Sequence, residues 1–265
     1  MKQSSVLDIS NLSLSADGQL LLDNGSFSLY TDEVLGIIGE SGSGKSLTAL
    51  SILKLLQHDI KASGSIMFNN KNIIYSSESE MRKIRGNDVS IIFQDPQSSL
   101  NPLITVGEQI SETIYFNQGL SWKDSKEYAI VLLRQVEISQ PSLRYSDYPH
   151  RFSGGMLQRV MIAIAISSHP KILIADEATT ALDRIVERNI IELLLRFKER
   201  YKFSLMLISH DLRIVAQYSD RIIVYKEGNI IEHGEVQKIV KNPSHPYTKR
   251  LFEISRIMNK KSTRN

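Results

Sequence analysis

Short apolar runs separated by polar turn residues fill the first third of the chain and predict β-strands. The runs cover residues 6–9, 20–22, 26–30 and 34–38, with turn signals at Ala16-Asp17-Gly18 and Asp23-Asn24-Gly25. We expect the first three runs to form an antiparallel element beside a buried strand at 34–38. Leucines spaced by three residues then predict a helix over residues 47–56.

The middle of the chain changes from strand signals to helix signals. Residues 64–70 indicate a strand and a turn, and residues 90–93 indicate a strand that ends at Gln94. From residue 95 to about 168, helical patterns punctuated by proline predict an inserted helical subdomain. The clearest helices are expected at 106–115 and 126–136.

Strand signals return in the last third of the chain, at residues 172–175, 205–208 and 222–225. The first two runs are apolar throughout, as central parallel strands are. The predicted fold class is therefore α/β, with a mixed sheet core, an antiparallel β subdomain and an inserted α-helical subdomain.

The length of 265 residues is enough to bury one sizeable core, so we expect a single α/β domain. A hydrophobic content of 42% and a charged content of 23% are typical of a globular protein in water. No apolar run approaches the ~20 residues that a membrane span needs, and the first residues lack a signal-peptide pattern. These features predict a cytoplasmic protein.

The sequence contains no cysteine, which excludes disulfides, thiolate catalysis, cysteine-held zinc and iron–sulfur clusters. The net charge is +3, but residues 241–265 hold seven Lys/Arg against one Glu, so the rest of the chain is mildly acidic. A nucleic-acid binder should carry a basic stripe with aromatic residues on its folded body. We therefore predict no nucleic-acid partner and interpret the basic C-terminal extension as a solvated tail.

One stretch matches the phosphate-binding pattern G-x-x-x-x-G-K-[ST] between the strand at 34–38 and the helix that follows. It is Gly39-Glu40-Ser41-Gly42-Ser43-Gly44-Lys45-Ser46. Its glycines leave main-chain N–H groups free to surround a triphosphate, and the helix start adds its positive dipole end. Lys45 can reach the outer phosphates, and Ser46 can ligate Mg²⁺. The alternative is that the pattern matches by chance, which the strand before it and the helix after it disfavour.

Polar residues follow three of the apolar strands, and ligands of open parallel sheets bind beyond such carboxyl ends. Asp176 can hold Mg²⁺ and Glu177 can polarise an attacking water, although the pair also fits the charge pattern of a helix N-terminus. Gln94 either offers its amide oxygen to metal or water or is an ordinary polar strand end. His210 either hydrogen-bonds a γ-phosphate or is a structural histidine.

A second anion cradle is predicted at Ser153-Gly154-Gly155, which precedes an apolar helical run at 160–166. A serine and two glycines at a helix start offer exposed N–H groups, a dipole end and a hydroxyl. The alternative is an N-cap serine followed by flexible glycines.

Taken in order, these elements resemble the nucleotide-binding subunit of ATP-binding cassette (ABC) transporters over almost the whole chain. The resemblance identifies Gln94 with the Q-loop, residues 153–158 with the signature sequence, Asp176-Glu177 with the Mg²⁺ carboxylate and catalytic glutamate, Ala181-Leu182-Asp183 with the D-loop, and His210 with the switch histidine. It implies an ABC-type P-loop NTPase that works as a head-to-tail dimer. In that dimer each ATP site is completed in trans by Ser153, Gly154, Gly155 and Asp183.

Within that family, three stretches are similar to the oligopeptide, dipeptide and nickel importer group: the phosphate loop, residues 93–96 and residues 242–248. Residues 156–159 and 174–177 are similar to the D-type nickel, or metallophore, ATPase subunit. The resemblance implies a second ATPase subunit that is a paralogue, two membrane permease subunits, and a periplasmic or lipid-anchored solute-binding protein that acts indirectly. It also implies a peripheral location on the cytoplasmic face of the inner or plasma membrane.

The expected organisation is one nucleotide-binding domain over residues 1–265, with its core and antiparallel β element at 1–94 and 169–240. The helical subdomain is expected at 95–168 and the basic extension at 241–265.

Three positions depart from the family pattern. Ala16 stands where the family stacks an aromatic residue on adenine, so adenine affinity is expected to be weaker or supplied by the partner. Asp32 replaces a usual Gly, and Ala178 replaces a usual Pro after Glu177, which leaves Glu177 less fixed. Many relatives also carry C-terminal cysteines for an iron–sulfur cluster, which this chain cannot form.

The predicted function is ATP hydrolysis coupled to import of nickel, a metallophore or peptides. Lys45, the loop amides, Mg²⁺ and Ser153 of the partner subunit neutralise phosphate charge, Glu177 activates water, and His210 holds the γ-phosphate. One alternative is a soluble ABC ATPase acting on nucleic acid or ribosomes, which usually needs a long coiled-coil insertion or two cassettes. Another is a nucleotide sensor without hydrolysis, which the complete set of catalytic residues disfavours. The six histidines show no ligand spacing, so direct nickel binding is not expected.

Overall fold

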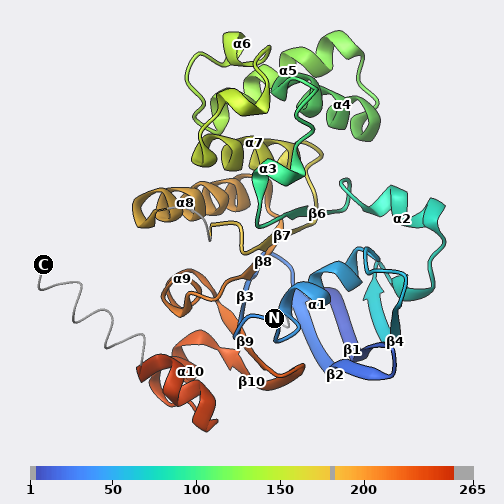
Figure 1. Cartoon of the computed structure of the whole chain (residues 1–265), viewed down its shortest axis with the longest axis vertical. Coiled ribbons are helices and arrows are strands. Elements are labelled where there is room, and N and C mark those ends of the chain that lie inside the picture. Colours follow the sequence, from blue (N-terminus) through green and yellow to red (C-terminus); the bar gives the residue numbers. More distant parts are fainter. Residues whose placement is uncertain (1–3, 180–182, 254–265) are drawn as a thin grey trace, which may run out of the picture. The chain divides into compact units, whose positions relative to one another are not determined.

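The computed structural model describes residues 4–179 and 183–253, which form two compact units (Figure 1). The first unit combines Met1–Ser77 with Ser204–Asn265, and the second consists of Glu78–Phe203. Each unit contains strands and helices of its own.

An antiparallel sheet with the order β2-β1-β4-β5 belongs to the first unit. Its elements are β1 (Ser5–Ala16), β2 (Gln19–Tyr30), β4 (Ile60–Phe68) and β5 (Lys71–Asn72), followed by the 3-10 helix η1 (Ile73–Tyr75). Asp17 and Gly18 connect β1 to β2 with positive φ angles of 49° and 79°, as a two-residue hairpin turn requires. The antiparallel element and its first turn are thus confirmed.

The second predicted turn, at Asp23-Asn24-Gly25, is wrong, because these residues continue β2 and join the runs 20–22 and 26–30 into one strand. Asn24 has a φ of 51°, and the register between β1 and β2 shifts on both sides of the pair Leu12–Gly25. The main-chain N–H of Asn24 donates to Ser13 Oγ over 2.9 Å, which satisfies it where the ladder is irregular. The turn-type residues therefore mark a bulge inside a strand.

A mixed sheet with the order β10-β9-β3-β8 also belongs to the first unit. Its strands are β3 (Val34–Ile38), β8 (Ser204–Ile208), β9 (Arg221–Lys226) and β10 (Asn229–Glu235). β8 and β9 flank β3 and run parallel to it, whereas β10 pairs antiparallel with β9. Every residue of β3 and β8 is buried, which explains their continuous apolar sequences.

The helices of the first unit are α1 (Lys45–Ile52), α9 (Leu212–Tyr218) and α10 (Val236–Lys241), and the chain is again helical over 246–253. α1 ends four residues before the predicted residue 56, and Lys54 then takes a positive φ of 52°. α9 packs directly on β3, because a Cβ at Gly36 would lie 2.1 Å from Val215 Cγ1. A buried apolar cluster joins Ile38 at the end of β3 to Val215 and to Phe252 near the C-terminus.

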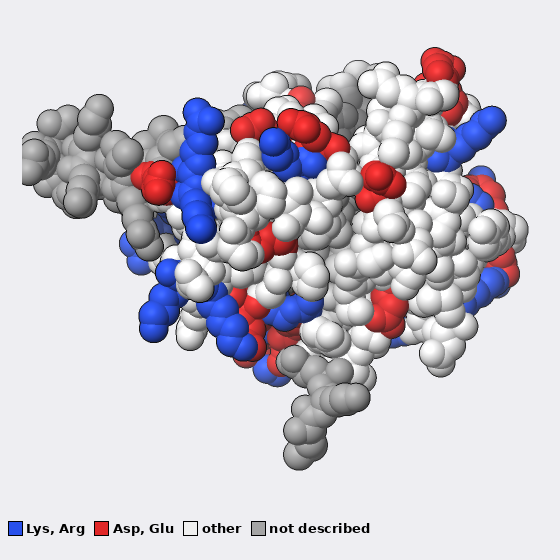
Figure 2. All heavy atoms as spheres, turned by 90° about the horizontal axis from the view of Figure 1, so that it is seen from below, with Lys and Arg blue, Asp and Glu red and all other residues white. Residues whose placement is uncertain are grey.

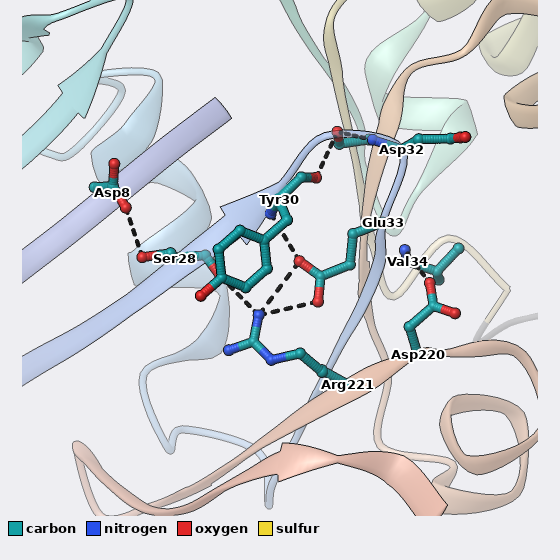
Figure 3. A network of polar contacts seen from close by, with 9 residues as sticks. Asp8, Ser28, Tyr30, Asp32, Glu33, Val34, Asp220 and Arg221 are labelled. Atoms are coloured by element: carbon teal, nitrogen blue, oxygen red, sulfur yellow. Dashed lines mark hydrogen bonds and ion pairs between the residues drawn. The ribbon is translucent and has the colours of Figure 1, made fainter. Parts of the chain in front are cut away.

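The start of β3 is held by a buried ion pair (Figure 3). Arg221 Nη1 on β9 lies 3.0 Å from Oε1 of Glu33, which is only 3% exposed. The N–H of Tyr30, the last residue of β2, donates to the same carboxylate over 2.7 Å, and its ring centroid lies 4.8 Å from the Arg221 guanidinium. Burial raises the pKa of Glu33, although the hydrogen bond from Tyr30 and the charge of Arg221 oppose it. The network ties three strands together.

The second unit contains a parallel pair of strands, β6 (Val89–Ile92) and β7 (Ile172–Asp176). Its helices are α2 (Glu78–Ile84), α3 (Pro96–Ser99), α4 (Val106–Gln118), α5 (Trp122–Gln135), α6 (Pro141–Arg144), the 3-10 helix η2 (Pro149–Arg151), α7 (Gly154–Ile166) and α8 (Arg184–Tyr201). α7 packs against α3, α4, α5, α8 and β6 and is therefore the centre of this unit (Figure 1). The helices predicted at 106–115 and 126–136 are confirmed as α4 and α5.

Candidate functional site

The predicted phosphate loop connects β3 to α1 and is organised around a buried lysine. Lys45, the first residue of α1, is 3% exposed. Its ammonium donates to the main-chain oxygens of Gly39 over 3.0 Å and of Glu40 over 2.8 Å. A flexible cation is thus held inside the loop by carbonyl groups that it can exchange for phosphate oxygens.

The backbone conformation at both ends of the loop requires glycine. Gly39 has a φ of 156°, and a Cβ there would lie 2.5 Å from the main-chain oxygen of Tyr225 and 2.7 Å from Ser43 Oγ. Gly44 has a φ of 104° and forms the N-cap of α1 without a side-chain cap. The absence of an acidic residue in the first turn of α1 leaves the positive dipole end of that helix for an anion.

The hydroxyls of the loop fit a bound phosphate and its metal ion. Ser43 Oγ is buried and has no hydrogen-bond partner among the described residues. Such an unsatisfied group at an anion cradle is explained by a ligand that the cradle binds. Ser46 is exposed in the first turn of α1, and its hydroxyl oxygen is of the kind that Mg²⁺ prefers.

A buried hydroxyl pair lies beneath the loop and was not predicted from the sequence. Thr48 Oγ1 donates to the Gly44 carbonyl over 3.0 Å and lies 3.1 Å from Tyr225 Oη. Burial raises the pKa of Tyr225 to about 12, so this hydroxyl keeps its proton and remains a hydrogen-bond partner. The pair links α1 to β9 behind the loop, although neither residue belongs to a motif.

His210 lies at the same edge of the mixed sheet as the phosphate loop. Ile208 pairs with Ile37, and His210 and Gly39 each lie two residues beyond that pair. His210 is exposed, whereas its neighbour Asp211 caps α9 and binds Arg213. Burial of Asp211 raises its pKa, but the hydrogen bonds from Arg213 outweigh burial and leave the pKa below its ordinary value.

Gln94 and the Asp176-Glu177 pair meet at one edge of the strand pair of the second unit. Ile92 pairs with Ala175, and Gln94 and Glu177 each lie two residues beyond. Asp176 is 7% exposed at the end of β7, whereas Gln94 is exposed. These oxygens are of the kind that Mg²⁺ prefers.

Glu177 adopts a left-handed backbone conformation, with a φ of 47°. This conformation is uncommon for a residue other than glycine, and such strain is concentrated at functional sites. The side chain is partly exposed at the strand end. The conformation turns the chain sharply after β7, and no residue pattern predicts it.

The second predicted cradle is the exposed N-terminus of α7. Ser153 Oγ accepts a hydrogen bond from the Met156 N–H over 3.4 Å, so the serine is an N-cap, and it is solvent exposed. A Cβ at Gly155 would lie 3.0 Å from Val186 Cγ1, so this glycine lets α7 approach α8 closely. Ser153 is therefore an N-cap, as one of the two interpretations of the sequence predicted. Its exposed position also allows contact with a ligand that is bound to another chain.

Asp183 caps α8, next to the start of α7. Its Oδ1 accepts from the N–H groups of Ile185 and Val186, both over 3.0 Å. Ala181 and Leu182 of the predicted D-loop lie outside the described residues. The contact of Gly155 with Val186 places the N-terminal turns of α7 and α8, and hence Ser153 and Asp183, near each other.

The side chains of the site determine how a metal ion could be held. Within residues 4–179 and 183–253, no group of three or more His, Cys, Asp or Glu side chains could hold a metal. Magnesium in nucleotide sites instead takes one or two carboxylates together with phosphate oxygens. Asp176 and Ser46 are suited to that role. In the described part of the chain, no helix has the length and apolar character needed to cross a membrane.

The chain is similar to known proteins in sequence and in fold. A family model described as ABC transporter matches residues 22–180. The chain is 44% identical over 257 residues to a putative peptide import ATP-binding protein of Brucella abortus, covering 95% of this chain and 77% of that protein. It is 46% identical over 232 residues to the dipeptide transport ATP-binding protein DppD of Haemophilus influenzae, covering 87% and 70%.

A solved structure shares the fold. The dimeric structure of a post-hydrolysis state of the ATP-binding cassette MJ0796 bound to ADP and Pi is similar with a TM-score of 0.77 and 26% identity, covering 87% of this chain and 98% of that one. The predicted fold class, with its mixed sheet, antiparallel β part and inserted helices, is confirmed.

Proposed function

Because the chain belongs to the ABC transporter family, we propose that it is the ATP-hydrolysing subunit of an importer for peptides, nickel or a metallophore. As a member of that family it is an ATPase that binds ATP and couples its hydrolysis to transport. The observation that carries the proposal is the phosphate loop, in which Lys45 is buried and held by the Gly39 and Glu40 carbonyls. A buried ammonium at this position is explained if the phosphate oxygens of ATP can replace the two carbonyl groups that hold it.

The cargo is a peptide if this importer follows the relatives described above, which are named for peptide and dipeptide import. The similarity of residues 156–159 and 174–177 to the D-type ATPase subunit favours nickel or a metallophore instead. The ATPase does not touch the cargo, so uptake of a labelled dipeptide against uptake of radioactive nickel by cells with and without the gene decides between them.

We assign roles in catalysis to the strand-end residues. Lys45 and the loop N–H groups bind the β- and γ-phosphates, Glu177 accepts a proton from the attacking water, and His210 orients the γ-phosphate. Ser46, Gln94 and Asp176 would hold Mg²⁺, which when bound supplies positive charge that offsets the charge of the phosphates. Catalysis then consists mainly of positioning and charge neutralisation.

We further propose a head-to-tail dimer in which Ser153, Gly154, Gly155 and Asp183 complete the ATP site of a second ATPase subunit. The exposed position of Ser153 and its closeness to Asp183 support this role. The second subunit is a paralogue, adenine is bound weakly at Ala16 or by that partner, and the dimer drives two permease subunits at the cytoplasmic face of the membrane. The whole chain then acts as one nucleotide-binding domain, with the boundaries predicted above.

The replacement Glu177→Gln tests the enzymatic part of the proposal. It removes the general base but keeps size and polarity, so ATP binding should persist while turnover falls by about 100-fold or more. Glu192→Gln, on the exposed ion pair of α8 with Arg188, is the matched control and should hydrolyse ATP like the wild type. Rapid hydrolysis by Glu177→Gln would remove Glu177 from its assigned role.

A soluble ATPase acting on nucleic acid or ribosomes is the competing function. On the face in Figure 2, the Lys and Arg side chains lie among Asp and Glu side chains and form no continuous basic stripe among the described residues. Co-purification with a membrane permease pair supports transport. Stimulation of the ATPase rate by DNA, RNA or ribosomes supports the competing function.

A further inference from the structure

Two buried hydroxyls connect β9 to the backbone of the phosphate loop. The hydroxyl of Tyr225 on β9 lies 3.1 Å from Thr48 Oγ1 on α1, and both residues are fully buried. Thr48 Oγ1 donates to the main-chain oxygen of Gly44 over 3.0 Å. A threonine hydroxyl has one proton, so Tyr225 is the donor in the bond to Thr48. The hydrogen bonds therefore run from Tyr225 through Thr48 to Gly44, the N-cap of α1.

The Gly44 carbonyl is held by two donors of the same residue. Besides the Thr48 hydroxyl, it accepts the main-chain N–H of Thr48 over 3.0 Å. These bonds point the carbonyl into α1. Because a peptide unit is planar and trans, the Lys45 N–H of the same unit points the opposite way, out of the N-terminus of the helix. That is the side from which a helix N-terminus binds a phosphate.

The same end of β9 meets the loop at two further places. The main-chain oxygen of Tyr225 lies so close to Gly39 that a Cβ there would be only 2.5 Å from it. In the turn after β9, the N–H of Gly228 donates to the main-chain oxygen of Ser43 over 3.1 Å. β9 and its turn thus support the loop from its first residue to the start of α1.

We propose that Tyr225 and Thr48 are positioning residues of the phosphate loop, which hold the Gly44 carbonyl so that the Lys45 N–H faces the phosphates of the nucleotide. The inference rests on the proposed role of the loop as the ATP site. Both side chains are fully buried, so they act on the nucleotide only through the loop backbone. A loop that is ordered before binding loses less conformational freedom when the nucleotide binds, which strengthens binding. Packing alone does not explain the Tyr225 hydroxyl, because phenylalanine would fill the same space without a polar group to bury.

Removal of either hydroxyl should weaken nucleotide binding. Tyr225→Phe keeps the ring, and Thr48→Val keeps the shape of the side chain. We expect each variant to bind both ATP and ADP about fivefold more weakly, since the main-chain N–H groups of such a loop surround the inner phosphates. KM for ATP should rise by the same factor with kcat retained, because the groups assigned to the chemical step are unchanged. Isothermal titration of the purified full chain measures the affinities, and steady-state hydrolysis measures KM and kcat.

Two control variants distinguish positioning from packing. Thr48→Ser keeps the hydroxyl and loses a methyl group, so it should bind both nucleotides nearly as the wild type does, whereas a packing role predicts a larger loss than in Thr48→Val. Ser51→Ala removes a hydroxyl of the same kind from α1, one that donates to the Leu47 carbonyl over 2.7 Å. This bond lies nearly one turn further from the loop, so Ser51→Ala should leave both affinities unchanged.

A double variant tests whether the two hydroxyls act together. Tyr225→Phe and Thr48→Val affect the same carbonyl, so the double variant should bind ATP about as weakly as Thr48→Val alone. Fully additive losses of binding free energy overturn the inference.

The outcomes separate this inference from the proposed function. If the wild type binds neither ATP nor ADP, the proposed function fails. If the wild type binds them and Tyr225→Phe and Thr48→Val bind them equally well, the two hydroxyls have no positioning role. The same conclusion follows if Thr48→Ser binds more weakly than Thr48→Val, or if Ser51→Ala loses as much affinity as Thr48→Val.

Discussion

Arg221 and Glu33 lie 188 residues apart in the sequence and form an ion pair with Nη1 3.0 Å from Oε1. The Glu33 side chain is almost fully buried, whereas that of Arg221 is 21% exposed. The pair fixes the start of β3, the strand that leads into the phosphate loop, against β9. A buried carboxylate in this position depends on its partner, because desolvation disfavours its charged form.

Removal of the arginine should therefore destabilise the fold. Arg221→Ala leaves the Glu33 charge buried without its counter-ion, and we expect the free energy of unfolding to fall by about 2–3 kcal/mol. Urea unfolding followed by circular dichroism measures this. Lys238→Ala, which breaks the exposed pair of Lys238 with Glu235, should change the stability little. Equal losses of unfolding free energy in the two variants would show that the buried ion pair stabilises the fold no more than the exposed one.

The raised pKa of Glu33 predicts a pH dependence. The pKa in the folded protein lies above the ordinary value of 4.5, so the folded state keeps this proton to a higher pH than the unfolded chain does. The contribution of Glu33 to stability is then fully present below pH 4.5 and is lost as pH rises through the folded pKa. The wild type should lose stability relative to Glu33→Gln over that window and stay constant relative to it at higher pH. The free energies of unfolding of both proteins across the window measure this loss. A wild type that gains stability relative to Glu33→Gln as pH rises contradicts the assignment.

The tight approach of Gly39 to β9 predicts a selective loss of nucleotide binding. Gly39→Ala places a methyl group 2.5 Å from the Tyr225 oxygen, so the loop must shift, and we expect ATP affinity to fall by more than about tenfold and stability by about 1–3 kcal/mol. Gly18→Ala in the β1–β2 turn is the control, since its φ is 79° and no atom lies within 4 Å of the added Cβ. It should lose about 1 kcal/mol of stability and bind ATP normally. Normal ATP binding by Gly39→Ala would mean that the loop is not rigid there.

Local patterns predicted the strands and helices well where burial and periodicity agree. β3 and β8 are buried at every residue, and each is recognisable as one apolar run. The turn expected at 23–25 was wrong because turn residues also occur in bulges, and only the partner strand decides which forms. The local sequence therefore identified the residues at which the strand is irregular, but it did not show whether they form a turn or a bulge.

The candidate site was predictable only where a residue type itself carries the chemistry. The phosphate loop and Asp176-Glu177 are recognisable as motifs, and the β6–β7 register brings Gln94 to the same edge as Glu177. The left-handed backbone of Glu177 and the hydroxyl pair of Thr48 and Tyr225 arise from tertiary packing between distant segments. The same is true of Arg221 and Glu33, so no local sequence pattern identifies them.

In the proposed dimer, two subunits share each ATP, one through its phosphate loop and the other through Ser153. The most direct test is the mass in solution, by light scattering, of Glu177→Gln together with the ATPase subunit that co-purifies with it. We expect the two subunits to associate with ATP, to stay apart without nucleotide, and to stay apart with ATP when Ser153→Arg is added. We also expect association to be retained with Ser121→Arg, which alters the exposed N-cap serine of α5 in the same unit. Association of the Ser153→Arg variant with ATP as readily as its parent would contradict this arrangement.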